Sequence, residues 1–284
     1  MEIFDELRQG KKNHNVVFQI MQDRLDEIIE NNNNVTIFYD ATNLSRKFRI
    51  PLYNRYKNKT RVTIVFISKP LEVIKEQNKQ RYTFKRVPEC TVEDMYKRIE
   101  VPRLGVDCDK IEVIGNYEDF EKEIEKNIHK PHSSPYHKER IDEHINMVID
   151  NAKKTNNNKL VEVAKFHDLG KSVCRVPAEI TSNAKRFFIE KRGEFYQYMQ
   201  HQNVSAMYYL INVGNEINKN KDFQDILEII ARHNDAHAGI SKKKIRRYNL
   251  RDELIELIYR FEEIDTTSKV ADELLEEYLA IQSK

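Results

Sequence analysis

The stretch Phe166-His167-Asp168-Leu169-Gly170-Lys171 decides how the second half of this 284-residue chain is interpreted. It continues an apolar stripe in which Leu160 and Ala164 recur at helical spacing, so His167 and Asp168 extend the inward face of a helix. A buried imidazole or carboxylate without a partner costs about 1–3 kcal/mol. The pair is therefore expected to face a group that compensates its polarity.

In four more predicted helices a polar residue continues the apolar face in the same way, and eight of the nine histidines lie at or after His129. These residues are His144, His201, His233 and Asp265. Any one of them could be a separate, hydrogen-bonded core residue, but five helices sending such groups inward favour one shared centre. Imidazole and carboxylate together suit zinc, iron, manganese, nickel or cobalt.

The order His144, His167-Asp168, Asp265 and the sequence around the central pair make residues 130–270 resemble the HD-domain superfamily of metal-dependent phosphohydrolases. The resemblance implies an all-α domain with one or two divalent transition-metal ions (Mn, Fe, Zn, Ni or Co). One ion would be held by His144, His167, Asp168 and Asp265, and a second by Asp168, His201 and His233. Asp168 would be the central catalytic residue.

Lys171, one turn after the pair, is the second catalytic candidate because it could neutralise phosphate charge. An ordinary lysine at a helix end is the alternative interpretation. His137 could touch substrate, but a loop position is favoured. His132 and His237 are expected at the surface.

In the first half, helices alternate with short apolar stretches, which predicts βαβ units and a parallel sheet. A helix is expected over residues 16–29, and strands over 35–39, 61–67 and 110–114. The turn-forming segment 130–137 marks a boundary, after which only helices are expected. The predicted architecture is an incomplete α/β kinase-like domain (1–128) followed by an all-α domain (129–284), separable by cleavage near 131–135.

Residues 38–47, 86–88 and 95–98 carry a resemblance to P-loop kinases of the polynucleotide kinase type. It implies that Asp40 and Asn43 lie beside nucleotide phosphates and that Arg86 belongs to a lid that contacts the nucleotide. Asp40 could equally be a helix N-cap.

The phosphate loop of that family, G-x-x-x-x-G-K-[ST], is missing from the given sequence. Only Gly170-Lys171-Ser172 has the correct end, and Lys165 stands where the first glycine belongs. The loop would precede Met1, so the true start lies upstream, the chain is truncated, or this half is a docking module. No phosphate transfer is expected from the chain as given.

Composition narrows the remaining choices. The chain has 48 basic and 46 acidic residues, a near-balance that argues against a general nucleic-acid coat or a membrane-surface protein. No apolar run approaches the roughly 20 residues that span a bilayer. Cys90, Cys108 and Cys174 are widely spaced, which is typical of free thiols in a reducing cytoplasm.

The expected function is metal-dependent hydrolysis of a phosphomonoester or phosphodiester. Kinase and HD domains occur together in nucleic-acid end-repair enzymes, so an RNA or DNA end or a nucleotide is the expected substrate. The alternative is a nucleotide or nucleic-acid binding module with a structural metal and no catalysis. The sequence names no protein partner.

Overall fold

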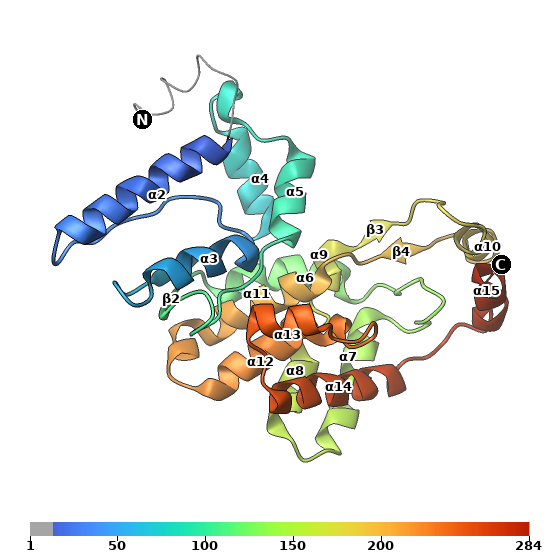
Figure 1. The fold of residues 1–284 in the computed structure, drawn as a ribbon. Helices are drawn as coiled ribbons and strands as arrows, with labels where there is room; N and C mark the ends of the chain where they lie inside the picture. Colours follow the sequence, from blue (N-terminus) through green and yellow to red (C-terminus); the bar gives the residue numbers. More distant parts are fainter. Residues whose placement is uncertain (1–13, 284) are drawn as a thin grey trace.

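The computed structural model describes residues 14–283, and most of them are helical (Figure 1). Its α-helices are α2 (His14–Asn31), α3 (Arg46–Tyr56), α4 (Leu71–Lys79), α5 (Glu89–Lys97), α6 (Glu121–Ile128), α7 (Ile141–Lys153), α8 (Asn158–Phe166), α9 (Lys171–Cys174), α10 (Asn183–Arg192), α11 (His201–Val213), α12 (Lys221–Arg232), α13 (Lys242–Tyr248), α14 (Asp252–Thr267) and α15 (Leu275–Gln282). Short 3-10 helices are η1 (Thr83–Lys85), η2 (Tyr117–Phe120), η3 (Gly214–Asn218) and η4 (His233–Asp235).

The first half contains a small parallel sheet. Strands β1 (Thr63–Ile67) and β2 (Lys110–Ile114) pair in parallel, with Thr63 opposite Lys110 and Ile67 opposite Ile114. Parallel strands need a long crossover, which α4 and α5 provide here. The predicted strands at 61–67 and 110–114 and the predicted helix at 16–29 are confirmed. This part is compatible with a kinase-like α/β start followed by helices.

The strand predicted at residues 35–39 is wrong. This segment joins no sheet, and the side chains of Val35 and Phe38 are 45% and 87% exposed. An apolar run becomes a strand only when a neighbouring strand supplies hydrogen bonds, and the β1–β2 ladder leaves this segment out.

The second half also holds a strand pair that the sequence did not predict. Strands β3 (Val176–Pro177) and β4 (Tyr196–Gln197) pair antiparallel and lead to α10, which packs against α15 in an arm beside the main body (Figure 1). The arm has its own small core of Ala184, Phe188, Phe195 and Tyr278. Two-residue strands are too short to give an alternating pattern, so helical periodicity dominated the prediction.

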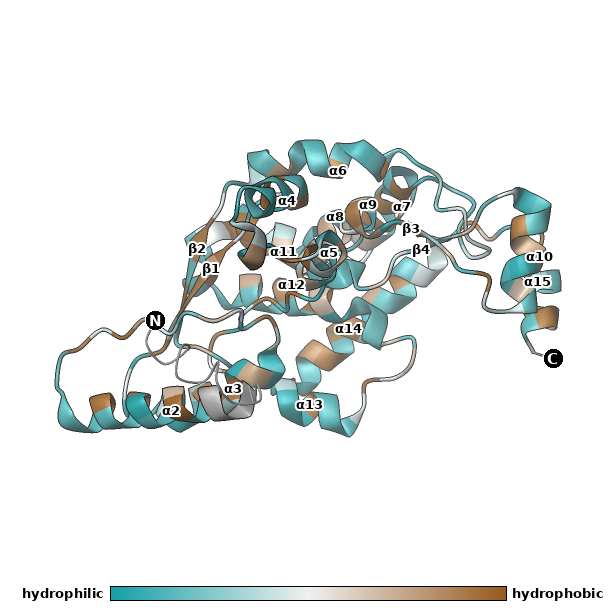
Figure 2. Ribbon diagram, turned by 90° about the horizontal axis from the view of Figure 1, so that it is seen from above, coloured by the Kyte–Doolittle hydropathy of each residue, from teal (hydrophilic) through white to brown (hydrophobic). Residues whose placement is uncertain are grey.

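The centre of the molecule is a helical core. Helix α11 lies inside it and packs against α12, α8 and α9, while α14 packs against α7 and α12 (Figure 2). Asn157 and Asn220 cap the first turns of α8 and α12 through their side-chain oxygens, which fixes where these helices begin. The packing brings the inward ends of α7, α8, α11, α12 and α14 together.

One hydrophobic cluster joins the two halves of the chain. It includes Ile111 and Phe120 from the first half together with Tyr208 and Ile230 from the second. The edge of the Phe120 ring meets Tyr208, with 5.6 Å between ring centroids. The boundary at 128/129 stays a prediction, but this shared core indicates that separating the halves would expose apolar surface on both sides.

Among residues 14–283, no helix combines the length and the apolar character that crossing a membrane requires.

Candidate metal centre

Six polar side chains meet where the five core helices converge. His144 lies on α7, His167 and Asp168 directly follow α8, His201 begins α11, His233 follows α12 and Asp265 lies on α14. All six are buried; the most exposed, His201, has a relative exposure of 7%. The structure thus brings together all six residues that the sequence suggested as ligands.

The two oxygens of Asp168 face different histidines. Oδ2 lies 3.4 Å from the Nε2 atoms of both His144 and His167. Oδ1 lies 3.1 Å from Nε2 of His201 and 3.9 Å from Nε2 of His233. Two groups of ligand atoms, each within 4.8 Å of one another, therefore share this carboxylate. A carboxylate placed in this way can bridge two cations.

Asp265 completes the first group. Its Oδ1 atom lies 2.9 Å from Nε2 of His144 and 3.6 Å from Nε2 of His167. The ammonium of Lys269, just after the end of α14, lies 3.2 Å from Oδ2 of the same aspartate. The second group has no carboxylate besides Asp168.

Three of the histidines are oriented by the same backbone contact. The Nδ1 atoms of His167, His201 and His233 lie 2.7–2.9 Å from the carbonyl oxygen three residues earlier in each case. A carbonyl only accepts, so each Nδ1 carries the proton and each neutral ring has its lone pair on Nε2. This is the second contact that metal-binding histidines usually make.

The Nε2 atoms of His201 and His233 consequently face each other at 3.2 Å. Two lone pairs at that distance repel unless a proton or a cation lies between them. Burial lowers the pKa of His233 to about 3, helped by the neighbouring His201 and His167, so its ring is neutral near pH 7. The Asn234 amide lies 3.3 Å from Nε2 of His201, and a metal cation between the rings is a group that could satisfy both of them.

The carboxylates show the same need for positive charge. Burial would raise the pKa of Asp168, but Lys171 and His167 hold it well below its usual value. Burial lowers the pKa of His167, yet the carboxylates of Asp168 and Asp265 outweigh this and raise it to about 9, so without a metal ion a proton on Nε2 supplies the positive charge that a bound cation would replace. Two ionised carboxylates in a buried site therefore draw a cation towards them.

The residues fit a transition-metal ion. The Nε2 atom of His167 is buried, points between Asp168 and Asp265, and makes no hydrogen bond. Such an unpartnered buried nitrogen is costly unless it is used as a ligand. A set of imidazoles and carboxylates suits manganese, iron, zinc, nickel or cobalt rather than magnesium.

Gly170 sets the distance between the two groups of ligands. A Cβ atom built on it would lie 2.2 Å from the carbonyl oxygen of His201 and 2.8 Å from the amide nitrogen of Ser205. The Gly170 amide also donates to the Ser205 hydroxyl at 2.9 Å. The turn that carries His167 and Asp168 therefore touches the backbone of α11 directly.

Lys171 points into the site. Its ammonium lies 2.7 Å from Oδ2 of Asp168 and 3.1 Å from Nε2 of His132, and the residue is buried. Lys171 is the first residue of the short helix α9, and it contacts a carboxylate rather than the carbonyls of a helix end. This placement gives no support to the interpretation as a dipole-completing lysine.

The surface position predicted for His132 is wrong, while His237 is exposed as predicted. His132 is 1% exposed, and its ring stacks on His137 with 4.3 Å between centroids. His137 does lie in a loop, as expected, but it is buried at 9% exposure. Both belong to a hairpin over residues 131–140 that folds against the metal centre.

Glu139 in the same hairpin was missed from the sequence. Its Oε1 atom lies 2.7 Å from Nδ1 of His137 and 3.3 Å from Nδ1 of His144. An irregular loop has no periodicity that reveals an inward-facing residue, so only the density of histidines between His129 and His144 pointed to this segment.

The candidate nucleotide-binding residues of the first half are not drawn together by any described contact. Asp40 and Arg86 are exposed, and the Arg86 guanidinium donates to the carbonyl of Arg81. The backbone of Asn43 has φ of 40°, and its carbonyl accepts from Arg49. The N-cap role considered for Asp40 is wrong, because Ser45 caps α3.

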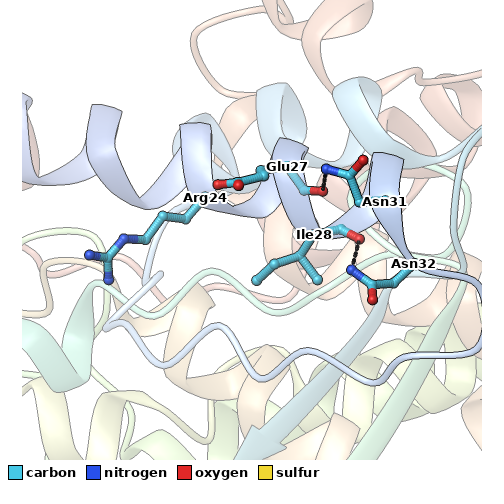
Figure 3. Close-up of a pocket in the computed structure, with 5 residues that line it drawn as sticks. All are labelled: Arg24, Glu27, Ile28, Asn31 and Asn32. Atoms are coloured by element: carbon cyan, nitrogen blue, oxygen red, sulfur yellow. Dashed lines mark hydrogen bonds between the residues drawn. The ribbon is translucent and has the colours of Figure 1, made fainter.

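The surface hollow beside α2 is separate from this centre. It is lined by Arg24, Glu27, Ile28, Asn31 and Asn32, and two of its asparagines only bond to carbonyls of their own helix (Figure 3). These side chains offer no converging chemical groups, so the hollow carries no functional assignment.

Comparison with known proteins gives one match. A family model described as an AAA domain, from a P-loop kinase-like family, matches residues 3–102, about a third of the chain. No curated protein and no solved structure matches the chain. The match supports a nucleotide-related first part.

Proposed function

We propose that this chain is a metal-dependent phosphohydrolase of the HD type, centred on Asp168, that acts on phosphate esters of nucleic-acid ends or nucleotides. The observation that carries the proposal is the position of Asp168, with one carboxylate oxygen toward His144 and His167 and the other toward His201 and His233. Structural metal sites are usually closed around one ion, whereas a shared carboxylate is typical of hydrolytic metal pairs.

The proposed ligands are His144, His167, Asp168 and Asp265 for one ion and Asp168, His201 and His233 for the other. When bound, the divalent ions would act as Lewis acids that activate water and draw electron density from a phosphoryl oxygen. Three of the four imidazoles, those of His167, His201 and His233, are oriented as ligands by Nδ1–H contacts to backbone carbonyls. These contacts keep the rings from turning, so the ligand geometry exists before substrate arrives.

Lys171 is the proposed substrate-binding group. Its ammonium already lies beside Asp168, on the Oδ2 side of the centre. A phosphate oxygen that approached this side would meet a fixed positive charge, which stabilises the charge that builds up in phosphoryl transfer. The ion pair with Asp168 keeps the ammonium in this position.

The kinase-like match over residues 3–102 supports a nucleotide or a nucleic-acid end as the substrate class. The domains 1–128 and 129–284, and the assignment of Asp40, Asn43 and Arg86 to nucleotide contacts, remain part of this proposal. The exposed positions of Asp40 and Arg86 leave them accessible to a ligand.

The test is hydrolysis after metal exchange. Protein stripped with a chelator and reloaded with manganese, iron, zinc, nickel or cobalt should cleave bis(p-nitrophenyl) phosphate or p-nitrophenyl phosphate. Oligonucleotides ending in 3′-phosphate, 5′-phosphate or 2′,3′-cyclic phosphate then identify the preferred ester. Asp168→Asn should abolish cleavage, while Asp150→Asn, an exposed aspartate on α7, should not change it. Metal-loaded, folded protein that cleaves none of these esters would refute the proposal.

A further inference from the structure

The hairpin over residues 131–140 is built around buried polar groups. Isolated bridges pair Pro131 with Arg140 and Ser134 with His137, and the His132 amide donates to the Glu139 carbonyl at 3.2 Å. His132, His137 and Glu139 point inward and are each 9% exposed or less. Apolar side chains would fill this space at lower cost, since burying imidazoles and a carboxylate is unfavourable without compensation.

The three side chains offer a recognised set of ligands. Their donor atoms, one from each residue, all lie within 4.8 Å of one another. Two histidines and one carboxylate form the ligand set of many iron sites and suit other borderline divalent metals as well. None of the three belongs to the six-residue centre around Asp168.

Backbone contacts orient one imidazole of this set in advance. Nδ1 of His132 lies 3.1 Å from the carbonyl oxygen of Glu139, so this nitrogen carries the proton and Nε2 has the lone pair. Without a metal ion this lone pair accepts from the Lys171 ammonium at 3.1 Å, a contact that a metal ion on Nε2 would replace. The position that this nitrogen faces therefore accommodates positive charge.

The charge of Glu139 is the decisive feature. Within 4.0 Å, the only basic side chains that its carboxylate meets among the described residues are His137 and His144. Its other oxygen accepts from the Val270 amide at 3.2 Å. A buried carboxylate with no lysine or arginine partner calls for a cation. Lys171 does not supply this positive charge for Glu139, because its ammonium is paired with Asp168.

We propose that His132, His137 and Glu139 bind a further divalent transition-metal ion, separate from the ions assigned to the Asp168 centre. The ligand set selects zinc, iron, manganese, cobalt or nickel over magnesium or calcium. The new site adjoins the main centre through one imidazole, because Oε1 of Glu139 lies 3.3 Å from Nδ1 of His144. The inference concerns metal binding and holds independently of which ester, if any, the chain hydrolyses.

Metal content per chain tests the proposal. Purified protein is stripped, reloaded with zinc or manganese, freed of excess ion, and analysed by mass spectrometry for metal. His137→Phe and Glu139→Gln should each bind one equivalent less than wild type. His129→Phe, an exposed histidine just before the hairpin, is the matched control and should keep the full number. Unfolding curves establish that the variants are folded.

A second measurement uses an intact hairpin. Asp168→Asn removes the shared ligand of the main centre, and titration with Co²⁺ should still develop visible absorption for one equivalent. Metal-free Asp168→Asn protein would overturn the proposal, as would full metal content in both hairpin variants. If the hairpin variants keep every ion but bind the main-centre ions about 10–100-fold more weakly, Glu139 merely orients His144 and the further site does not exist. Hydrolysis is not the readout, so failure here is distinguishable from failure of the proposed function.

Discussion

Arg46 and Glu228, 182 positions apart in the sequence, form a buried ion pair in which Nη1 of Arg46 lies 2.7 Å from Oε2 of Glu228. Both side chains are 1% exposed. Glu228 lies on α12, the helix that His233 directly follows, and it also accepts from Arg232 at 3.1 Å. The first half of the chain thus holds the helix that presents one of the proposed metal ligands.

Glu228→Gln is expected to destabilise the protein by about 3–5 kcal/mol, because it leaves the buried Arg46 guanidinium without its counter-charge. Urea unfolding followed by circular dichroism measures the change. Glu256→Gln, an exposed glutamate on α14, should stay within about 0.5 kcal/mol of wild type. Equal stability of the two variants would show that the ion pair contributes nothing.

The contribution of Glu228 should also depend on pH in a defined direction. Burial would raise the pKa of this carboxyl, but Arg46, Arg232 and Arg103 lower it from 4.5 to about 2. Because the pKa of Glu228 is lower in the folded state, its charge stabilises the folded protein fully at pH values above the unfolded-state pKa of 4.5. This stabilisation is lost as the pH falls from 4.5 towards about 2. In metal-free protein, the stability gap between wild type and Glu228→Gln should therefore narrow between pH 6 and pH 3. A constant gap would contradict this assignment.

Residues 129–284 expressed alone are expected to be much less stable than the whole chain. Removal of residues 1–128 strips Ile111 and Phe120 from the shared cluster and leaves Glu228 without Arg46. This expectation reverses the free separation predicted from the turn-forming segment at 130–137. Thermal unfolding of the fragment, compared with the full chain, measures the effect. A fragment with an unchanged midpoint would restore the simpler two-domain picture.

His201→Ala and His233→Ala should each remove one metal equivalent and lower hydrolysis by about 10–100-fold or more. Each variant removes a lone pair from the Oδ1 side of Asp168 and leaves the Oδ2 side intact. Metal analysis and steady-state kinetics check this, with the exposed His237→Ala as control. Unchanged metal with a raised KM would mean that these histidines contact substrate instead.

Gly170→Ala should damage the centre although it touches no ligand side chain. The added Cβ would lie 2.2 Å from the His201 carbonyl oxygen, so the turn bearing Asp168 must move away from α11. We expect lower metal affinity and at least a tenfold loss of hydrolysis, since misplacement by about 1 Å costs on the order of 100-fold. Gly193→Ala, at φ of 82° with open space around it, controls for backbone strain alone. Equal metal affinity in both variants would contradict the role given to Gly170.

Helical periodicity predicted that six polar residues face the core, and the structure buries all six. His144, His233 and Asp265 each continue an apolar stripe, and a side chain on the inward face of a helix has few other places to point. The strand at 110–114 was also predictable, because an apolar β-branched run bounded by glycine is a local signal. The strand expected at 35–39 failed because pairing depends on a distant partner.

The hairpin and the shared core could not be predicted by the same reasoning. His132 and Glu139 are buried by a loop that folds back on α7, and a loop has no repeating pattern to show which side chains face inward. The Arg46–Glu228 pair depends on the packing of two distant helices. In a sequence with 48 basic and 46 acidic residues, most charged side chains are expected at the surface. No local pattern therefore predicts that these two are buried.

The contact between Gly170 and the backbone of α11 also limits how this chain can change over generations. Every replacement of glycine adds at least a Cβ, so no amino-acid change at this codon fits the space that the His201 carbonyl leaves. Each possible substitution at this position would therefore force the backbone to move. The spacing between the two groups of polar side chains therefore depends on glycine at position 170.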